Sequence, residues 1–167
     1  MTPLESPIEW MLAAAIRRCV RAGNHFTVQN LVEFPPMSFD EFRRLACNRT
    51  KVPFFGCAPQ VSIESYRVDF LFVTNGLTGR SHLLAVECDG HDFHERTREQ
   101  ATRDRGRDRS LMNLGIPVMR FTGSEISRNA DACAAEIHAY LGGKFKEEIA
   151  NWSRLNAMTW SLKEFVA

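Results

Sequence analysis

The stretch Val86-Glu87-Cys88-Asp89-Gly90-His91-Asp92-Phe93-His94 decides how this chain is expected to fold. It closes an apolar segment with Glu-x-Asp-Gly and continues into a histidine-containing turn. A second segment, Arg67-Val68-Asp69-Phe70, carries another aspartate 18 residues before Glu87. Because adjacent strands that end in carboxylates bring those side chains to one edge of a sheet, the two segments predict a cluster of acids there.

A hairpin accounts for the polar and the apolar face of both segments. Residues 66–74 and 82–89 alternate with a period of two, and residues 75–79, Asn-Gly-Leu-Thr-Gly, form the turn. Centring the hairpin on Thr78 predicts four cross-strand pairs: Leu71 with Ala85, Val73 with Leu83, Asp69 with Glu87, and Arg67 with Asp89. The opposite face then collects Val68, Phe70, Phe72, Leu84, Val86 and Cys88.

The rest of the chain predicts helices and a crossover. The capping signatures Ser6-Pro7-Ile8-Glu9 and Ser38-Phe39-Asp40-Glu41 start two helices. The expected elements are helices over 7–21, 39–48, 95–113 (closed by Gly115) and 129–141 (ending at Gly142-Gly143), and strands at 61–63 and 117–121. Strand, helix and strand from Val86 to Phe121 predict a parallel crossover. Residues 24–37 fit either strand or loop.

Composition describes an ordinary globular chain. It has 167 residues, 44% of them apolar and 25% charged, which suits one domain. Its net charge of +1 provides no bulk attraction to nucleic acid, so any phosphate contact depends on local basic clusters. The five cysteines are scattered and lack Cys-x-x-Cys spacing, which favours a reducing cytoplasm over a disulfide framework or a zinc site. No segment approaches the ~20 apolar residues of a membrane span.

The three predicted strand carboxylates, Asp69, Glu87 and Asp89, are hard oxygen ligands of the kind that Mg²⁺ binds. A bound metal lowers the pKa of an attacking water and neutralises transition-state charge in phosphodiester cleavage. His94 could then donate a proton to the leaving oxygen, orient water or bind phosphate. The structural alternative is that Glu-x-Asp is a solvated strand end, with Arg67 and Asp89 as a cross-strand ion pair.

Two further groups have both a structural and a functional interpretation. Glu9 fits the capping box of its helix, and it could also reach the metal site as an outer acid if that helix packs across the sheet. The helix after the site is rich in arginine. Its arginines either form a solvated face of i, i+4 pairs or grip the DNA backbone beside the site, with Arg96, Arg98 and Arg103 as the candidates.

These residues resemble the restriction-endonuclease-like superfamily, the PD-(D/E)XK nucleases, and within it the branch of very-short-patch repair endonucleases and related small bacterial endonuclease domains. The matching positions are Tyr66 to Phe70, Ala85 to Gly90, His94, Gln100, Asp104, Arg107, Leu111 and Gly115 to Phe121. The resemblance covers residues 60–126 and, loosely, the first helix.

The resemblance implies an α/β fold, a mixed sheet flanked by helices, with Asp69 as the central metal ligand and Glu87 in the second acidic position. Asp89 stands where the superfamily usually has lysine, so either Asp89 and His94 take over its role or the site is catalytically weak. The repair branch has a glutamate of the first helix near the site, which favours the functional role of Glu9. Gln100, Asp104 and Arg107 match a helix signature that holds the helix against the sheet.

We therefore expect a nuclease domain over residues 1–143 that cuts DNA, most naturally duplex, with Mg²⁺ or, as a substitute, Mn²⁺. The alternatives are a nucleic-acid-binding or assembly module that lost the reaction, and a metal-dependent RNase or other phosphoesterase. Residues 144–167 form a helical extension with an apolar stripe that includes Trp152 and Trp160. The stripe favours packed core over an interface; as an interface it would form a homodimer that cuts both strands.

Overall fold

The computed structural model describes residues 4–21, 31–47, 54–75, 80–90 and 98–166. For residues 47, 98–101, 103–104 and 156–166 only the backbone is described. One mixed sheet has the strand order β1-β2-β3-β4-β5. The strands are β1 (Leu31–Glu33), β2 (Phe54–Ile63), β3 (Tyr66–Asn75), β4 (Ser81–Asp89) and β5 (Val118–Thr122). The two outer pairs, β1 with β2 and β4 with β5, are parallel, and the inner pairs are antiparallel.

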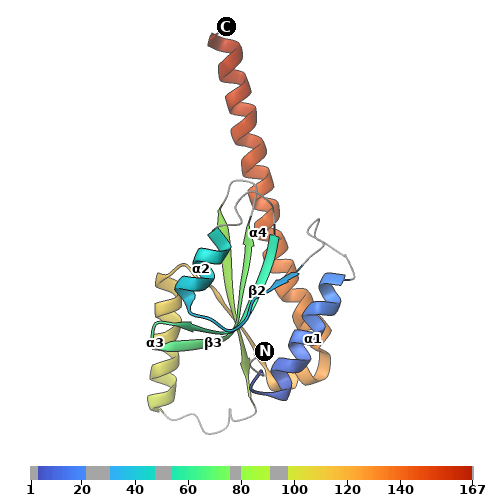
Figure 1. The fold of residues 1–167 in the computed structure, drawn as a ribbon, viewed down its shortest axis with the longest axis vertical. Helices are drawn as coiled ribbons and strands as arrows, with labels where there is room; N and C mark the ends of the chain where they lie inside the picture. Colours follow the sequence, from blue (N-terminus) through green and yellow to red (C-terminus); the bar gives the residue numbers. More distant parts are fainter. Residues whose placement is uncertain (1–3, 22–30, 48–53, 76–79, 91–97, 167) are drawn as a thin grey trace.

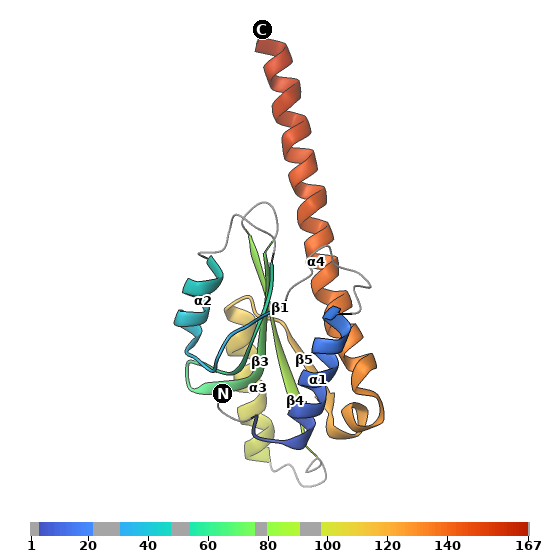
Figure 2. The ribbon, with the colours of Figure 1, turned by 45° about the vertical axis from the view of Figure 1, so that its right-hand side comes forward.

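Helices cover both faces of the sheet (Figures 1 and 2). The helices α1 (Pro7–Arg21) and α4 (Gly123–Val166) pack on one face, over a core that includes Phe70, Phe72 and Val86. The helices α2 (Phe39–Cys47) and α3 (Arg98–Asn113) cover the other face, over a core that includes Leu71 and Ala85. The predicted α/β class is confirmed, and so is the parallel crossover from β4 through α3 to β5.

The register of the central hairpin is confirmed where its ladder runs. Leu71 pairs with Ala85 and Val73 with Leu83. Five of the six residues assigned to the apolar face pack in or against the core under α1 and α4. The exception is Val68, which is fully buried in the core on the other face.

A local bend explains why Val68 changes face. Gln60 in β2 has a left-handed backbone, φ 52°, and interrupts the β2–β3 pairing between Pro59–Phe70 and Val61–Val68. Because strand alternation is lost at such a residue, Val61, the next residue of β2, presents the opposite face. Val68 pairs with Val61 and turns to the same face with it.

The bend also shortens the predicted ladder. The β3–β4 ladder ends at the pair Phe70–Val86, so it includes neither the predicted pair Asp69–Glu87 nor Arg67. Arg67 instead forms an ion pair with Glu5, with 2.6 Å between its Nη2 and the carboxylate. The prediction that Arg67 faces Asp89 is therefore wrong, because β3 has already turned away from β4 at this point.

Local signals place most helix ends correctly. The α1 boundaries match the prediction, and Ser6 caps the helix through its hydroxyl, which accepts the backbone N–H of Glu9 at 3.2 Å. The helix α3 ends in a left-handed Gly115, φ 72°, with the N–H of Ile116 donating to the carbonyl of Leu111 at 2.9 Å. In the described ranges no helix has the length and apolar composition needed to cross a membrane.

The last helix differs from the prediction. It does not end at Gly142-Gly143 but continues to Val166, and its C-terminal part projects beyond the sheet (Figure 1). Asn129 is non-helical within it and caps the following turn, with its side-chain oxygen accepting the N–H of Ala132 at 3.0 Å. The predicted start at Asn129 is thus confirmed as a capped kink, and the glycine pair is tolerated inside the helix.

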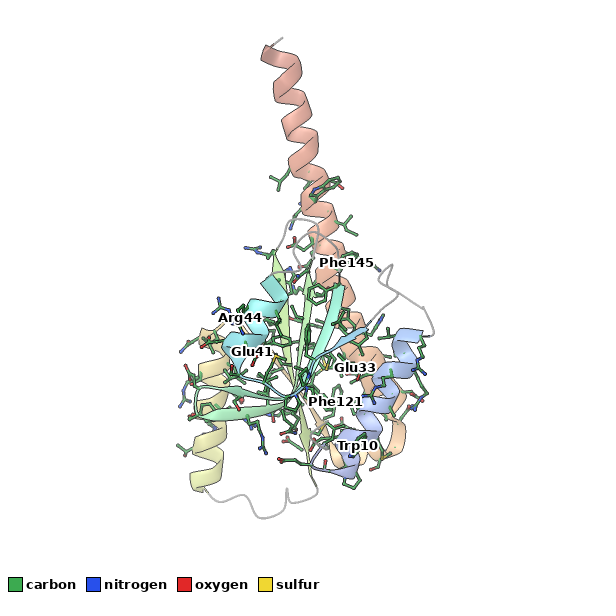
Figure 3. All side chains as sticks on the ribbon, viewed as in Figure 1. Trp10, Glu33, Glu41, Arg44, Phe121 and Phe145 are labelled. Atoms are coloured by element: carbon green, nitrogen blue, oxygen red, sulfur yellow. The ribbon has the colours of Figure 1, made fainter. Side chains whose placement is uncertain are left out.

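The apolar stripe of the tail is only partly core. Phe145, labelled in Figure 3, is buried where α4 still faces the sheet. Beyond it Ile149, Trp152 and Leu155 are 37%, 44% and 59% exposed. The packed-core interpretation is wrong for these three residues, because α4 has left the body of the protein before it reaches them.

Candidate active site

Asp69 lies at the bend of β3, where a backbone group of β4 holds its side chain. Its Oδ2 accepts the N–H of Cys88 at 2.7 Å. The pKa of Asp69 is raised to about 6. Burial is the largest cause, the hydrogen bond from Cys88 opposes it, and the negative charges of Glu9 and Asp89 add to it. The bend therefore keeps a partly buried acid next to the end of β4.

Glu87 is the buried acid of β4, with 4% of its surface exposed. Its Oε2 lies 3.4 Å from Nη1 of Arg107 on α3, while among the described residues its buried Oε1 has no hydrogen-bond partner. The pKa of Glu87 is raised to about 7. Burial is the largest cause, the positive charge of Arg107 opposes it, and the negative charge of Asp69 adds to it. An acid with one buried oxygen still open is a group that a cation or a water would satisfy.

Glu9 fulfils its predicted structural role. One carboxylate oxygen accepts the hydroxyl of Ser6 at 2.9 Å, and the other accepts the N–H of Glu5 at 3.0 Å and the side-chain amide of Gln60 at 2.9 Å. Glu9 is 5% exposed, and its charge is one cause of the raised pKa of Asp69. The first helix therefore does bring its glutamate near the predicted site, although three hydrogen bonds engage the carboxylate.

The predicted three-carboxylate cluster is less compact than expected. Asp89 ends β4, where it pairs with Thr122 of β5, and its charge contributes to the raised pKa values of Asp69 and Glu87. Within the described part of the chain, no three His, Cys, Asp or Glu side chains are grouped to hold a metal ion. The charge of Asp69 raises the pKa of Glu87, whereas the acids that raise the pKa of Asp69 are Glu9 and Asp89.

Four predicted site residues cannot be placed. His94 and Arg96 lie outside the described residues. Arg98 and Arg103 belong to α3, of which only the backbone is described at these positions.

Cys88 is described, and burial raises the pKa of its thiol, so it stays protonated at neutral pH.

Two residues of the site surroundings were missed from the sequence. Arg120 pairs with Glu87 across the β4–β5 ladder and donates to Asp108 of α3 at 3.0 Å, which ties that helix to the sheet. An arginine inside the otherwise apolar strand after Pro117 was an available signal for it. Gln60 gave no such signal, because its role depends on the left-handed backbone at that position.

A comparison with known protein families finds a match for the central part of the chain. The family model REase_MTES_1575, a restriction-endonuclease-like family, matches residues 46–141, which is more than half of the chain and includes Asp69, Glu87 and Arg107. No curated protein and no solved structure matches the chain. On the strength of the family match, the chain belongs to the restriction-endonuclease-like family REase_MTES_1575.

Proposed function

We propose that this protein is a metal-dependent DNA endonuclease whose central acids are Asp69 and Glu87. Family membership supports nuclease chemistry. The observation that carries the proposal is a partly buried and a buried carboxylate on neighbouring strands, Asp69 and Glu87, with pKa values raised to about 6 and about 7. Since protein folding gains little from burying like charges together, such a pair is typical of a site built for a cation or a proton.

The donor set fits a hard divalent cation. Mg²⁺ commonly takes one or two carboxylates and completes its octahedron with water and phosphate oxygens, so the pair suffices without a third acid. The open Oε1 of Glu87 supports this fit. When bound, the ion would lower the pKa of a water and offset phosphate charge; Mn²⁺ is the expected substitute. Asp69 and Glu87 would hold it, while Asp89 would act as a further ligand or orient the water.

The remaining assignments place the substrate around this pair. His94 would transfer a proton or contact phosphate, and Glu9 would support Asp69 from α1. Arg96, which precedes α3, and Arg98 and Arg103, which belong to α3, would bind the backbone of duplex DNA. An acid at position 89 in place of lysine, together with His94, is what relates this site to the very-short-patch repair branch and favours a role in DNA repair.

A second candidate function is a nucleic-acid-binding or assembly module that keeps the fold without the reaction. The observation in its favour is that no group of three metal-ligating side chains is assembled among the described residues. Metal titration separates the two functions. A working site gains thermal stability from Mn²⁺ or Mg²⁺ by mass action, and Asp69→Ala abolishes the gain; a dead site shows no carboxylate-dependent shift.

We also propose that the projecting part of α4 pairs with a second copy of itself. A stripe with Ile149, Trp152 and Leu155 exposed is the surface such a pair would cover. Sedimentation at several concentrations tests this, with Trp152→Glu expected to leave a monomer.

The cysteines support the cellular setting that we propose. The four described cysteines, Cys19, Cys57, Cys88 and Cys133, are all free thiols. Free thiols at scattered positions fit a reducing compartment, and we place the protein in the cytoplasm.

The proposed function is tested by nicking of supercoiled plasmid. We expect cleavage that requires Mg²⁺ or Mn²⁺ and stops with EDTA, and that Asp69→Ala abolishes without unfolding the protein. Parallel assays on duplex, mismatched and branched DNA, single strands and RNA identify the substrate. An Asp69→Ala protein that nicks as fast as the parent after equal purification would overturn the assignment.

A further inference from the structure

A cavity of about 550 Å³ lies at the opposite end of β4 from the acids. Its floor is the start of β4, Ser81 to Leu83, and it is bounded by α2, the turn after α3, and α4. Ser81 lies six positions before Glu87 in β4, so at ~3.3 Å per residue this end of the cavity floor is roughly 20 Å from Glu87. It is therefore a separate site and not part of the acidic pair.

Two helices from opposite faces of the sheet, α2 and α4, each contribute a cation and an aromatic ring to this cavity. On α2, the guanidinium of Arg43 lies over the ring of Phe39, 5.7 Å from its centroid. On α4, Nζ of Lys144 lies over the ring of Tyr140, 6.0 Å from its centroid. All four side chains line the cavity. A stacked guanidinium still presents its N–H edge, so rings and donors are offered together.

A histidine completes the wall on the sheet side. Nε2 of His82 lies 3.0 Å from Oε1 of Glu148, a residue of α4 that is 2% exposed. This contact fixes the imidazole while His82 still lines the cavity. A buried carboxylate behind a histidine orients the ring, as a structural support would for a ligand-binding group.

The charge of the cavity is positive. Its described lining residues include Arg43 and Lys144 but no Asp or Glu. Lys144 also binds Glu147 at 2.9 Å, on the exposed side of α4, whereas Arg43 forms no ion pair within the described part of the chain. Arg43 is thus the cation most available to an incoming anion.

We propose that this cavity binds a nucleotide, with its phosphate on Arg43, Lys144 and His82 and its base against Phe39 and Tyr140. Cations beside aromatic rings are the combination that single-stranded nucleic acid uses, because each nucleotide carries one phosphate and one flat base. The proposal rests on the proposed function only in assigning that nucleotide to the DNA substrate. At ~3.4 Å per nucleotide, a strand that reaches from the acids to this cavity spans roughly six nucleotides.

The test measures binding by the full chain in EDTA, where no cleavage occurs. One probe is fluorescein-labelled (dT)12, followed by anisotropy over a range of salt; the others are dAMP, adenosine and inorganic phosphate, followed by amide NMR shifts. Arg43→Ala is compared with Arg44→Ala, which removes the same charge from the next residue of α2. Arg44 is 70% exposed, lies 4.0 Å from Glu41 and does not line the cavity. Arg44 and Glu41 are labelled in Figure 3.

We expect dAMP to shift the amides of Ser81 to Leu83 and Tyr140 to Lys144 more than adenosine or phosphate does. Arg43→Ala should weaken (dT)12 binding at least fivefold and reduce the log–log salt slope by about 0.7, while Arg44→Ala stays within twofold of the parent. Phe39→Leu, which keeps an apolar side chain and removes the ring, should weaken binding roughly tenfold.

Three outcomes overturn the proposal: equal effects of Arg43→Ala and Arg44→Ala, no effect of Phe39→Leu, or phosphate acting as strongly as dAMP, which would leave an anion site only. Comparable affinity for dAMP and (dT)12 would support a nucleotide pocket whose ligand is the free nucleotide. Tighter binding of (dT)12 would support a pocket that binds one nucleotide of a strand. Because this binding is measured without metal, its failure leaves the nicking result untouched, and a failure of nicking leaves this binding measurable.

Discussion

Asp69 and Cys88 are joined by a 2.7 Å hydrogen bond from the Cys88 N–H to the Asp69 carboxylate, just beyond the last ladder pair of β3 and β4. The carboxylate thus takes the place of a backbone acceptor where β3 bends away. Its position beside Glu87 is a consequence of the sheet and not of a flexible loop. Asp69→Asn retains an acceptor for this bond, so we expect it to fold, and it separates the charge of Asp69 from its structural contact.

The stability of the metal-free protein should fall as pH rises from about 4 to 7. The native pKa values of Asp69 and Glu87, about 6 and about 7, exceed their ordinary values of 3.8 and 4.5, so the folded state binds more protons than the unfolded state in this range. The stability gained at low pH is lost as pH passes the native pKa, by on the order of 3 kcal/mol for a two-unit shift. Urea denaturation in EDTA at several pH values measures this. The free energy of unfolding should depend less steeply on pH in Glu87→Gln than in the parent. Equal slopes in the two proteins would contradict the raised pKa of Glu87.

Removing Arg107 should destabilise the protein and raise the pKa of Glu87 further. The Arg107–Glu87 ion pair is mostly buried, with 18% and 6% of the two side chains exposed, so its loss leaves a charge in the interior. We expect Arg107→Ala to cost about 3 kcal/mol at pH 8 in urea denaturation. Arg109→Ala, an exposed arginine of the same helix, is the matched control and should change stability by less than about 0.5 kcal/mol. Similar losses for both variants would mean that the ion pair is unimportant.

The two roles of Glu9 are separable by Glu9→Gln. The amide retains an oxygen for Ser6 or Gln60, but it removes the negative charge that raises the pKa of Asp69. The pH at which divalent-dependent nicking reaches half its maximum should therefore move down in the variant. Ser6→Ala is the control for the cap: it should cost about 1 kcal/mol of stability and leave the pH profile unchanged. An unshifted profile in Glu9→Gln would restrict Glu9 to capping.

Gly143→Ala should stabilise the protein by up to about 1 kcal/mol. Gly143 lies inside α4, and a Cβ there meets nothing within 4 Å, so alanine gains helix propensity without a clash. Gly56→Ala should instead cost about 1–3 kcal/mol, because its Cβ would lie 2.9 Å from the rings of Phe34 and Phe54. Thermal denaturation measures both. No gain from Gly143→Ala would indicate that the helix ends at the glycine pair after all.

Periodicity predicted the hairpin at the centre of the fold because one alternation pattern fixes both faces and hence the register. It placed Leu71 opposite Ala85 correctly. This register also fixes the end of β4 that carries Glu87. It could not predict the full length of β2, since all but two residues of Phe54–Ile63 are buried and leave little alternation to detect. The bend at Gln60 was equally invisible, because the sequence carries no glycine where the backbone becomes left-handed.

Local rules failed where tertiary context decides. A Gly-Gly pair is a typical helix stop, yet Leu141 and Phe145, on either side of it, are both buried against the body of the protein, which keeps α4 helical. Arg67 was assigned to Asp89 by extending a ladder that the fold ends early, and Glu5 takes that place. The sequence named Asp69 and Glu87 as candidate acids; the ion pair of Glu87 with Arg107 depends on the packing of α3, which the sequence did not show.

The most direct test of the central claim, that Asp69 and Glu87 jointly hold a divalent cation, is calorimetric titration of Mn²⁺ into the full chain at pH 8. We predict one strong site per chain, weakened at least about tenfold in both Asp69→Asn and Glu87→Gln. Asp131→Asn, which alters an acid that is 66% exposed and ion-paired with Arg18, should bind like the parent. Equal Mn²⁺ affinity in all four proteins, or no binding by the parent, would contradict the claim.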